Sequence, residues 1–476
     1  MNPVWPGVSY AKHQIEGIEW MLKQETVGYS VPNTDYVVHG GILGDVMGLG
    51  KTIQSLALIV NGSAKNTLIL MPLAVRGQWE EAALKCQVNL FIAGKSGWER
   101  KGKRFLKGKS IYLAHYDMLV NHKEMFRQEI AWNRIILDEA HRIRNTNTST
   151  GSTVLKLKAK YKWALTATPI VNDFKDVVAY LKFIGFKIDG SGWSARFKEW
   201  IPHIYMARTL SEGEAPAGLT MPPEAISETL HLDFTDKAEE ELYLSIVNNL
   251  ESKWRSQKSS LNGQAYQLAK FAMLLRLRQI SVNPQIYIDA RKKEPFGWAG
   301  PEFVMPSRKF DEISHLLRDA HEAGEGRRWI IFCQFHAEMD KLSEYLKVFP
   351  YVGSVLKYHG GMNMKERDST IEESKIVSGD KKQDVILIQL QAGGTGLNLQ
   401  HYDRIIFTSP WWTSALLEQA MGRAIRIGQK EIVKVYWLKL KAEEGRFSID
   451  DFMMNKVDVK KNMAETFLSW SYNKNN

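Results

Sequence analysis

Short apolar runs alternate with segments of helical spacing along the first part of the chain. Runs such as TLILMPL, SIYLAHY, RIILDEAH and KWALTATP each pass from a buried strand into polar residues. Open α/β sheets place their ligands at the carboxyl ends of such strands. A second series of the same kind begins near residue 326, with RRWIIFCQF, DVILIQLQAGG and DRIIFTSP. The pattern predicts an α/β protein with two units of parallel sheet.

A region of different texture separates the two series. Residues 236–258 and 264–281 have the apolar spacing of amphipathic helices. SEGEAPAGL and KKEPFGWAGPEFVMP are typical of exposed loops, and the second is the preferred boundary before the second unit. We therefore predict four parts: lobe one at 1–195, helical protrusions and linker at 196–300, lobe two at 301–442, and a C-terminal helix at 443–476. That helix either braces lobe two onto lobe one or is a plain surface helix.

Composition narrows the class of protein. With 476 residues the chain is too long for one core, and 44% hydrophobic residues is ordinary for a globular protein. We expect no membrane span and no secretion signal, since no apolar run is long enough and the start lacks a basic region followed by an apolar core. The net charge of +10 favours a polyanionic partner, with a solvated basic surface as the alternative. The two cysteines cannot form a disulfide framework or a Cys-rich zinc site, which fits a reducing compartment.

The stretch GDVMGLGKT resembles a phosphate-binding loop with one departure. The common pattern is G-x-x-x-x-G-K-[ST], whereas Asp45 stands at its first position here. The first glycine is dispensable because backbone N–H groups at a strand-to-helix turn form the cradle. Gly48 and Gly50 can adopt unusual backbone angles, Lys51 can contact the β- and γ-phosphates, and Thr52 can ligate Mg²⁺. A glycine-rich turn with a chance lysine is the alternative for this stretch alone.

An acidic pair, Asp138 and Glu139, follows directly after the buried strand in WNRIILDEAHRIRN. One carboxylate can hold Mg²⁺ and the next can polarise an attacking water, as nucleotide hydrolysis requires. Acidic residues also favour helix N-termini, so a solvated helix start is the alternative reading. The Lys-Thr loop upstream makes that alternative weak.

Seven segments then occur in the order of a known family: AKHQIEGIEWM, GGILGDVMGLGKTIQ, LILMPLAVRGQW, LDEAH, LTATPIVND, QLQAGGTGLNLQ and EQAMGRAIRIGQ. From about residue 10 to residue 440 the chain resembles the Swi/Snf-type ATPases, the double-stranded-DNA translocases of helicase superfamily two. That family writes its first motif D-E-M-G-L-G-K-T, so Asp45 is the residue expected in it. The resemblance implies two tandem RecA-like lobes with helical protrusions between them.

Three segments, RIILDEAHRIRN, LLRLRQISVNP and TSPWWTSALLEQA, are closest to the post-replication-repair and transcription-termination-factor branch. Many members of that branch carry an inserted RING domain, which two distant cysteines cannot form. We expect a minimal motor. The chain departs from the family pattern at four positions: Val46 for Glu, Ala167 for Gly, Val171 for Gln and Gly422 for Asp. None removes a group that touches phosphate, metal or water, so they bear on the coupling of nucleotide to DNA.

The resemblance also assigns site residues, with ATP and Mg²⁺ as cofactors. ATP binding is assigned to Gln14, Asp45, Gly48, Leu49, Gly50, Lys51, Thr52, Gly394 and Gly396, metal binding to Thr52 and Asp138, catalysis to Glu139, Gln419, Arg423 and Arg426, and coupling to His141, Thr166 and Thr168. Arg423 and Arg426 are three residues apart and share one helix face. Their charge reaches the transferring phosphoryl group only when the lobes close, which gates hydrolysis. The alternative is a pair of surface arginines on a basic helix.

A motor that steps along any sequence must bind the DNA backbone rather than base edges. The candidate contacts are Arg76, Gln78, His115, Tyr116, Gln334, Gly360, Gly361 and Thr395. Trp79, Trp411 and Trp412 are expected to pack in the core rather than to stack on bases.

The leading function is a DNA-stimulated ATPase that translocates on duplex DNA and displaces or remodels protein–DNA complexes. A strand-separating helicase is one alternative, and a nucleic-acid-binding scaffold with a degenerate ATPase is another. We expect a monomeric motor inside the cell, in the nucleus, or in viral or host cytoplasm if a virus encodes it. The absence of appended modules favours either a compact genome or a partner protein that supplies targeting.

Overall fold

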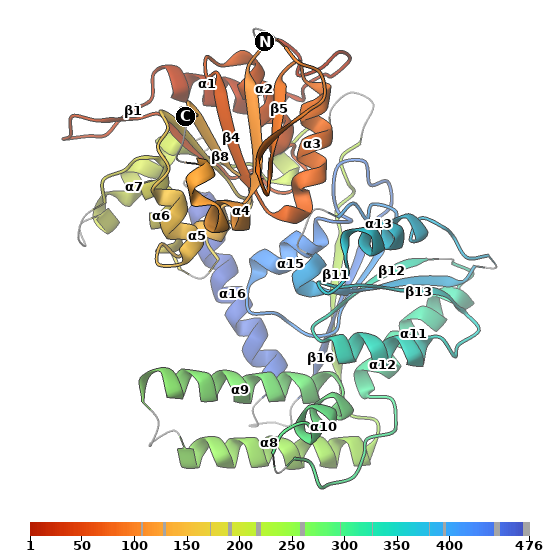
Figure 1. The fold of residues 1–476 in the computed structure, drawn as a ribbon. Coiled ribbons are helices and arrows are strands. Elements are labelled where there is room, and N and C mark those ends of the chain that lie inside the picture. The colour runs from red at the N-terminus through yellow and green to blue at the C-terminus, as the bar shows by residue number, and fades with distance from the viewer. Residues whose placement is uncertain are drawn as a thin grey trace.

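The computed structural model describes residues 1–105, 108–126, 130–171, 173–188, 193–215, 220–257, 262–295, 297–325, 327–379, 381–393, 397–441 and 448–469. These residues form two α/β lobes, a helical region beside the second lobe, and a C-terminal helix that runs between them (Figure 1). The predicted α/β class is confirmed.

In the described residues of lobe one, an eight-stranded sheet has the order β10–β3–β9–β8–β4–β7–β5–β6. All neighbours are parallel except β5 and β6, which form an antiparallel edge. The strands are β3 (Gly40–Leu43), β4 (Asn66–Met71), β5 (Asn89–Gly94), β6 (Gly97–Lys101), β7 (Ser110–His115), β8 (Arg134–Leu137), β9 (Tyr161–Leu165) and β10 (Tyr205–Met206), beside a small antiparallel pair, β1 (Tyr29–Ser30) and β2 (Val37–Val38).

The apolar strands of this sheet are buried on both faces, which is why they read as continuous hydrophobic runs. Successive residues of β4 alternate between two clusters: Ile69 packs with Trp163 on one face and Leu70 packs with Ala164 on the other. The helices that contribute to these layers are α1 (Lys12–Thr26), α2 (Lys51–Asn61), α3 (Arg76–Lys85), α4 (Tyr116–Asn121), α5 (Ser149–Leu155), α6 (Asp176–Ile184) and α7 (Trp193–Ile204). Because β3, β8 and β9 are adjacent and parallel, the loops that follow them meet at one sheet edge.

Lobe two is built, within the described part of the chain, on a six-stranded parallel sheet of order β11–β16–β15–β12–β14–β13. Its strands are β11 (Ile226–Leu232), β12 (Arg328–Cys333), β13 (Val352–Tyr358), β14 (Gln383–Gln389), β15 (Arg404–Phe407) and β16 (Lys434–Leu440). One apolar layer includes α11 (Arg308–Glu322) and α12 (His336–Leu346). The other includes α13 (Met364–Glu373), α14 (Leu390–Gly393) and α15 (Ser414–Met421).

Two strands come from the segment 196–300 that we predicted to hold only protrusions and linker. β10 extends the lobe-one sheet beside β3, and β11 forms the edge of the lobe-two sheet beside β16. β10 has only two residues, inside the short apolar run IYMA, and most of β11 is exposed, so neither has the longer apolar run on which a sequence reading depends.

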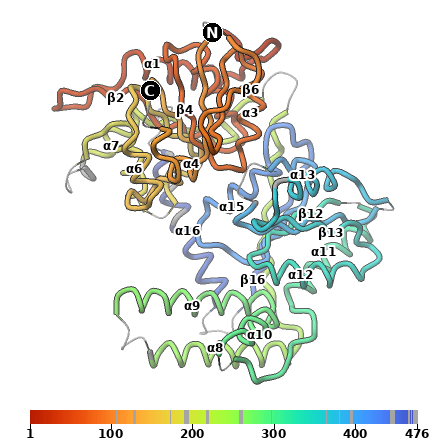
Figure 2. Tube along the Cα trace, in the orientation of Figure 1, coloured from red at the N-terminus to blue at the C-terminus, as the bar shows by residue number. Residues whose placement is uncertain are grey.

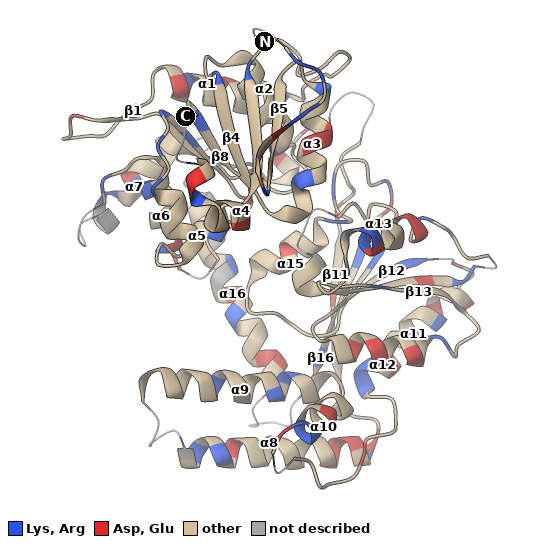
Figure 3. Ribbon diagram, viewed as in Figure 1, with Lys and Arg blue, Asp and Glu red and all other residues tan. Residues whose placement is uncertain are grey.

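The two long helices predicted in this segment are confirmed as α8 (Lys237–Gln257) and α9 (Gly263–Val282), followed by α10 (Pro284–Lys292). They lie at the end of the molecule remote from lobe one (Figure 1). Lys and Arg alternate with Asp and Glu along α8, α11 and α13 in Figure 3, so in this view the positive charge is not gathered on one element. None of the helices in the described ranges is both long and apolar enough to cross a membrane.

The last helix, α16 (Ile449–Leu468), contributes to three cores in turn. Ile449 and Met453 lie in the core of the protrusion, Val457 in that of lobe two and Phe467 in that of lobe one. The tube in Figure 2 shows this helix running from the level of α9 up to lobe one. We call it the strut, because one rigid element joins all three parts.

Candidate nucleotide site and interlobe clefts

The loop between β3 and α2 has the backbone of a phosphate cradle. Gly48 and Gly50 have φ angles of +93° and +81°, which other residues rarely adopt. The Lys51 ammonium donates to the Asp45 carbonyl at 2.6 Å and the Val46 carbonyl at 3.4 Å. Burial lowers the pKa of Lys51, and the charges of Glu139, Asp45 and Asp138 oppose that shift. The lysine therefore rests on carbonyl oxygens of its own loop, which phosphate oxygens can replace.

Helix α1 fixes this loop from outside. The Gln14 amide donates to the Leu49 carbonyl at 3.3 Å, and His13 Nε2 lies 3.1 Å from the same oxygen. The Gln14 carbonyl in turn accepts from the Ala11 N–H at 3.1 Å. Gln14 thus lies beside Gly50, which is also assigned to ATP binding.

The side chain of Asp45 is used within the protein. The carboxylate is fully buried and forms a two-pronged ion pair with Arg208, with N–O distances of 2.9 and 2.6 Å. Gln54 donates to the same carboxylate at 2.9 Å, and Arg208 also bonds the His13 carbonyl. Asp45 thus supports the loop and does not contact phosphate through its carboxylate. Arg208 went unnoticed in the sequence, although a lone arginine after the apolar run IYMA implies a buried partner.

The acidic pair after β8 is held from three sides. Trp79 Nε1 donates to one Asp138 oxygen at 2.7 Å, and the Glu139 N–H donates to the other at 3.0 Å. The Tyr116 hydroxyl donates to the Asp138 carbonyl at 2.8 Å. Glu139 has a φ of +49°, a left-handed conformation that is uncommon outside glycine and aims it differently from its neighbour. Such strain is typical of functional positions.

The electrostatics of the pair separate the two carboxyl groups. Burial, and then the charge of Glu139, raises the pKa of Asp138. Burial alone would also raise the pKa of Glu139, but His141, Lys51 and Arg423 together hold it below its usual value. His141 Nδ1 lies 3.3 Å from the Glu139 carboxylate. Glu139 therefore stays ionised, as a group that accepts a proton from water must.

Lobe two brings its assigned side chains to this edge. Arg423 is only 5% exposed, and burial lowers its pKa to about 10 while the charges of Glu139 and Asp138 oppose the shift. A Cβ on Gly48 would lie 3.4 Å from the Cβ of Arg426. The lobes are therefore in contact at the phosphate loop, with Arg423 in the field of the acidic pair.

The residues fit Mg²⁺ bound together with a nucleotide. No group of three or more His, Cys, Asp or Glu side chains that could hold a metal occurs among the residues that the structure describes. Mg²⁺ usually takes one or two protein oxygens, with waters and substrate phosphates completing its octahedron. Asp138 and the Thr52 hydroxyl, on the first turn of α2, are of that kind. Bound there, Mg²⁺ would neutralise charge on the phosphates.

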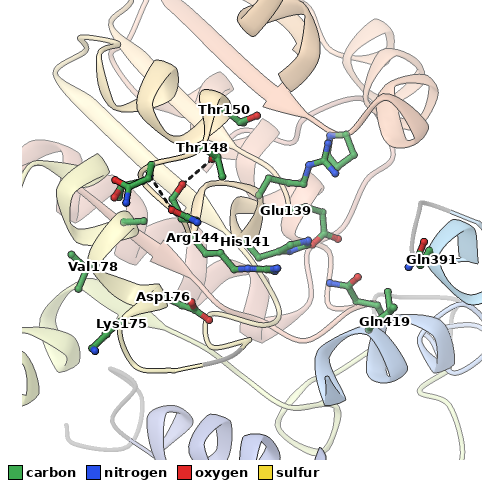
Figure 4. A pocket seen from close by; sticks show the side chains of 17 residues that line it. Glu139, His141, Arg144, Thr148, Thr150, Lys175, Asp176, Val178, Gln391 and Gln419 are labelled. Carbon is green, nitrogen blue, oxygen red and sulfur yellow. Dashed lines mark hydrogen bonds and ion pairs between the residues drawn. The ribbon is translucent and has the colours of Figure 1, made fainter. Parts of the chain in front are cut away.

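Two large clefts lie between the lobes. The first, of about 1150 Å³, is walled by Glu139, His141 and Arg144 of lobe one and by Gln391 and Gln419 of lobe two. In Figure 4, Gln419 faces Glu139 and His141 across it. The second, of about 900 Å³, includes Gln78 from lobe one and Gly360 from lobe two among its lining residues.

The remaining residues assigned to coupling, DNA contact and ATP binding lie in several different loops and helices. Thr166 and Thr168, after β9, are buried, and Thr166 Oγ1 accepts from the Thr168 N–H at 3.2 Å. Arg76 begins α3, and Gly361 follows Gly360. Gly394, Thr395 and Gly396 lie outside the described residues.

Three of the residues assigned to DNA have side chains that are already engaged. Tyr116 is 1% exposed and bonded to Asp138, so its side chain cannot reach a surface ligand. His115 caps α4 by accepting from the Met118 N–H at 3.2 Å. The Gln334 amide donates to the Ser409 and Pro410 carbonyls and accepts from Arg278. For these three the sequence located the right edge of the sheet and not the direction of the side chain.

The tryptophans pack as predicted. Trp79 is 1% exposed in the lobe-one core, and Arg278 lies 4.5 Å from the ring centre of Trp411 and 5.4 Å from that of Trp412. The bond from Trp79 to Asp138 was not foreseen.

Two family models match this chain. An SNF2-related domain matches residues 13–214, and a helicase conserved C-terminal domain matches residues 308–428. A probable global transactivator of Orgyia pseudotsugata multicapsid polyhedrosis virus is 27% identical over 94% of this chain and 89% of its own length. A probable ATP-dependent DNA helicase of Arabidopsis thaliana is 30% identical over 91% of this chain and 41% of its own length. The chain thus spans nearly all of the viral relative and about two fifths of the plant one.

Among solved structures, the SWI2/SNF2 ATPase core of Sulfolobus solfataricus in complex with double-stranded DNA is 24% identical, with a TM-score of 0.41. The match covers 99% of this chain and 96% of that one.

Proposed function

Because this chain belongs to the SNF2-type ATPases, which hydrolyse ATP, we propose that its turnover depends on double-stranded DNA and drives translocation along it. The branch of the family stays open. The observation that carries the proposal is the division of the site: the phosphate loop and acidic pair lie on lobe one, and Arg423 and Arg426 lie on lobe two. A site divided in this way works only when the lobes are held together.

In the mechanism we propose, Lys51 leaves the carbonyl oxygens of its loop and binds the β- and γ-phosphates, while Gln14 faces the adenine. Glu139 orients the attacking water and accepts its proton, because its ionised form is favoured by His141 and Lys51. Arg423 and Arg426 stabilise charge on the transferring phosphoryl group, a contribution of about 10³–10⁵ in rate for arginine fingers. Mg²⁺ at Thr52 and Asp138 would supply further positive charge.

We further propose that duplex DNA binds across the cleft lined by Gln78 and Gly360. These two positions come from opposite lobes and were assigned to DNA from the sequence. DNA held by both would favour the closed arrangement and so couple binding to hydrolysis. Backbone contacts would make the affinity fall steeply with salt.

Steady-state ATP turnover with and without duplex DNA tests the proposal. We expect strong stimulation by duplex DNA and weaker stimulation by single strands of the same length. Equal turnover with and without DNA would show that closure does not depend on it. The absence of turnover under both conditions would instead favour a nucleic-acid-binding scaffold.

Strand separation is the second candidate, favoured by the helicase name of the plant relative. Displacement of a third strand from duplex DNA, measured beside unwinding of a forked duplex, separates the two activities. We expect displacement without unwinding. The names of the viral and plant relatives also support a site of action at intracellular DNA, with a targeting partner that remains to be identified by affinity capture from the native host.

A further inference from the structure

A third, smaller cavity lies between the phosphate loop and α15. Its volume is about 280 Å³, and among the residues assigned to nucleotide contacts and catalysis it includes only Gln419. Both lobes line it, with Met47 and Leu210 on one side and Met421 and Ile425 on the other. It is therefore an interlobe cavity that adjoins the nucleotide site and is lined mostly by residues without an assigned role in it.

The lining is mostly apolar, and its polar members are Thr168, Glu418 and Gln419. Thr168 lines the cavity and is only 5% exposed. Its hydroxyl has no hydrogen-bond partner in the described part of the protein. A buried hydroxyl without a partner is unfavourable, and a ligand with a hydrogen-bonding group would relieve it. Cavities with apolar walls and a few polar groups are the usual form of small-molecule sites.

Three of the four departures from the family pattern meet in this cavity. Val46, Ala167 and Gly422 come from motifs far apart in the chain, yet all three line it. Where the family pattern has Glu and Asp, this chain has Val and Gly, so two carboxylates of that pattern are absent from a lining that retains Glu418. Their absence removes the desolvation that an apolar ligand would otherwise have to overcome.

We propose that this cavity binds a small, largely apolar molecule of one or two rings that carries one hydrogen-bonding group. An apolar cavity of about 150 Å³ suffices for benzene in another protein, so 280 Å³ accommodates two rings. The bound molecule contacts both lobes and therefore favours the arrangement in which they touch. That last consequence for the motor rests on the proposed function, whereas binding does not.

Ligand-observed NMR with 2-naphthol, on the full chain without nucleotide or DNA, tests the proposal. We expect saturable binding to the wild type. Val46→Glu, which restores the family residue, should weaken it at least tenfold because a second carboxylate enters the lining beside Glu418. Val178→Glu is the matched control, since Val178 lines the neighbouring cleft, and it should leave the affinity unchanged.

The hydroxyl is tested separately. Thr168→Val should weaken 2-naphthol about two- to tenfold, the range of one hydrogen bond, and Thr168→Ser should restore it. Melting curves of each variant verify the fold, and Gly422→Asp replaces Val46→Glu if the latter does not fold. Absence of saturable binding to the wild type would overturn the proposal. Equal loss in Val46→Glu and Val178→Glu would overturn it as well.

Discussion

The two lobes are joined at two places that differ in their chemistry. At the phosphate loop, Gly48 approaches Arg426, and a Cβ on Gly422 would lie 3.2 Å from Met47. At the strut, Phe467 packs on Tyr205 with a ring separation of 4.6 Å, and Asp450 pairs with the fully buried Lys309 at 2.7 Å. The first junction consists of glycines, loop backbone and buried charge, and the second of an apolar anchor and a buried ion pair.

This contrast shows how the chain can combine a changeable contact with a permanent one. Lys51 and Arg423 lie in the first junction with lowered pKa values, so both are charges that a ligand would satisfy better than the protein does. The Asp450 carboxylate accepts hydrogen bonds from the Ser281 hydroxyl, from the Lys309 ammonium and from the Leu440 N–H. Its charge is therefore satisfied within the protein. We expect nucleotide to alter the first junction and to leave the second intact.

The largest effect is expected from Arg426→Ala at the first junction. Loss of an arginine finger should raise the activation free energy of hydrolysis by about 4–7 kcal/mol and so lower kcat. The binding of ATP and of duplex DNA should change little. Lysine should rescue only in part, because it lacks the planar fork. The measurement is ATPase activity at saturating DNA beside the salt dependence of DNA binding.

Arg318→Ala is the control for that variant, since Arg318 is exposed on α11 and pairs with Asp319. It should leave kcat unchanged. If Arg426→Ala had normal kcat and weakened DNA binding, Arg426 would not be an arginine finger. The mechanism in which lobe closure gates hydrolysis would then be wrong as well.

Glu139→Gln should have the next largest effect. Removal of the proton acceptor should raise the activation free energy of hydrolysis by about 3–5 kcal/mol, the range of general base catalysis, and so lower turnover. ATP binding should stay nearly intact. Lys51→Ala should instead weaken ATP binding itself. Nucleotide titration and single-turnover hydrolysis distinguish the two, and near-normal hydrolysis by Glu139→Gln would exclude the assigned role.

At the second junction, Phe467→Ala should act on stability rather than on chemistry. Phe467 is fully buried, so truncation should destabilise lobe one by about 3 kcal/mol through the cavity that it leaves. Thermal melting and hydrogen exchange of lobe one are the measurements. Val459→Ala, at a 55% exposed position of the same helix, should change little. If Phe467→Ala matched that control, the strut would not be anchored in lobe one.

The smallest effect is expected from Gly48→Ala, which should reduce stability by about 1–2 kcal/mol because its φ is +93°. Gly185→Ala is a strain control, with a φ of +119° and no atom within 4 Å of an added Cβ. Both variants should have a lower melting temperature than the wild type. Only Gly48→Ala should also hydrolyse ATP more slowly. Equal turnover in the two would show that the approach of Gly48 to Arg426 does not matter for catalysis.

The sequence was sufficient for features that depend on local pattern. The apolar runs located β4, β7, β8 and β9 of the first sheet and β12, β14 and β15 of the second, and the helical spacing located α8 and α9 to within one residue at each end. It did not locate β10, which has only two residues, or β11, whose side chains are mostly exposed, because neither strand has a long apolar run. The assignments of nucleotide, metal and catalytic residues remain predictions for the experiments above.

By itself, the sequence determined the α/β class, the family and the loops that carry its motifs, because these follow from short-range periodicity and spacing. Only the tertiary structure decided what each side chain in those loops touches. Asp45 points to Arg208, 163 residues away, and Trp79 holds Asp138 across 59 residues. The meeting of Val46, Ala167 and Gly422 in one cavity likewise has no trace in local pattern. The physical reason is that burial, ion pairing and cavity shape depend on contacts between distant residues, which form only when the parallel sheets fold and the two lobes come together.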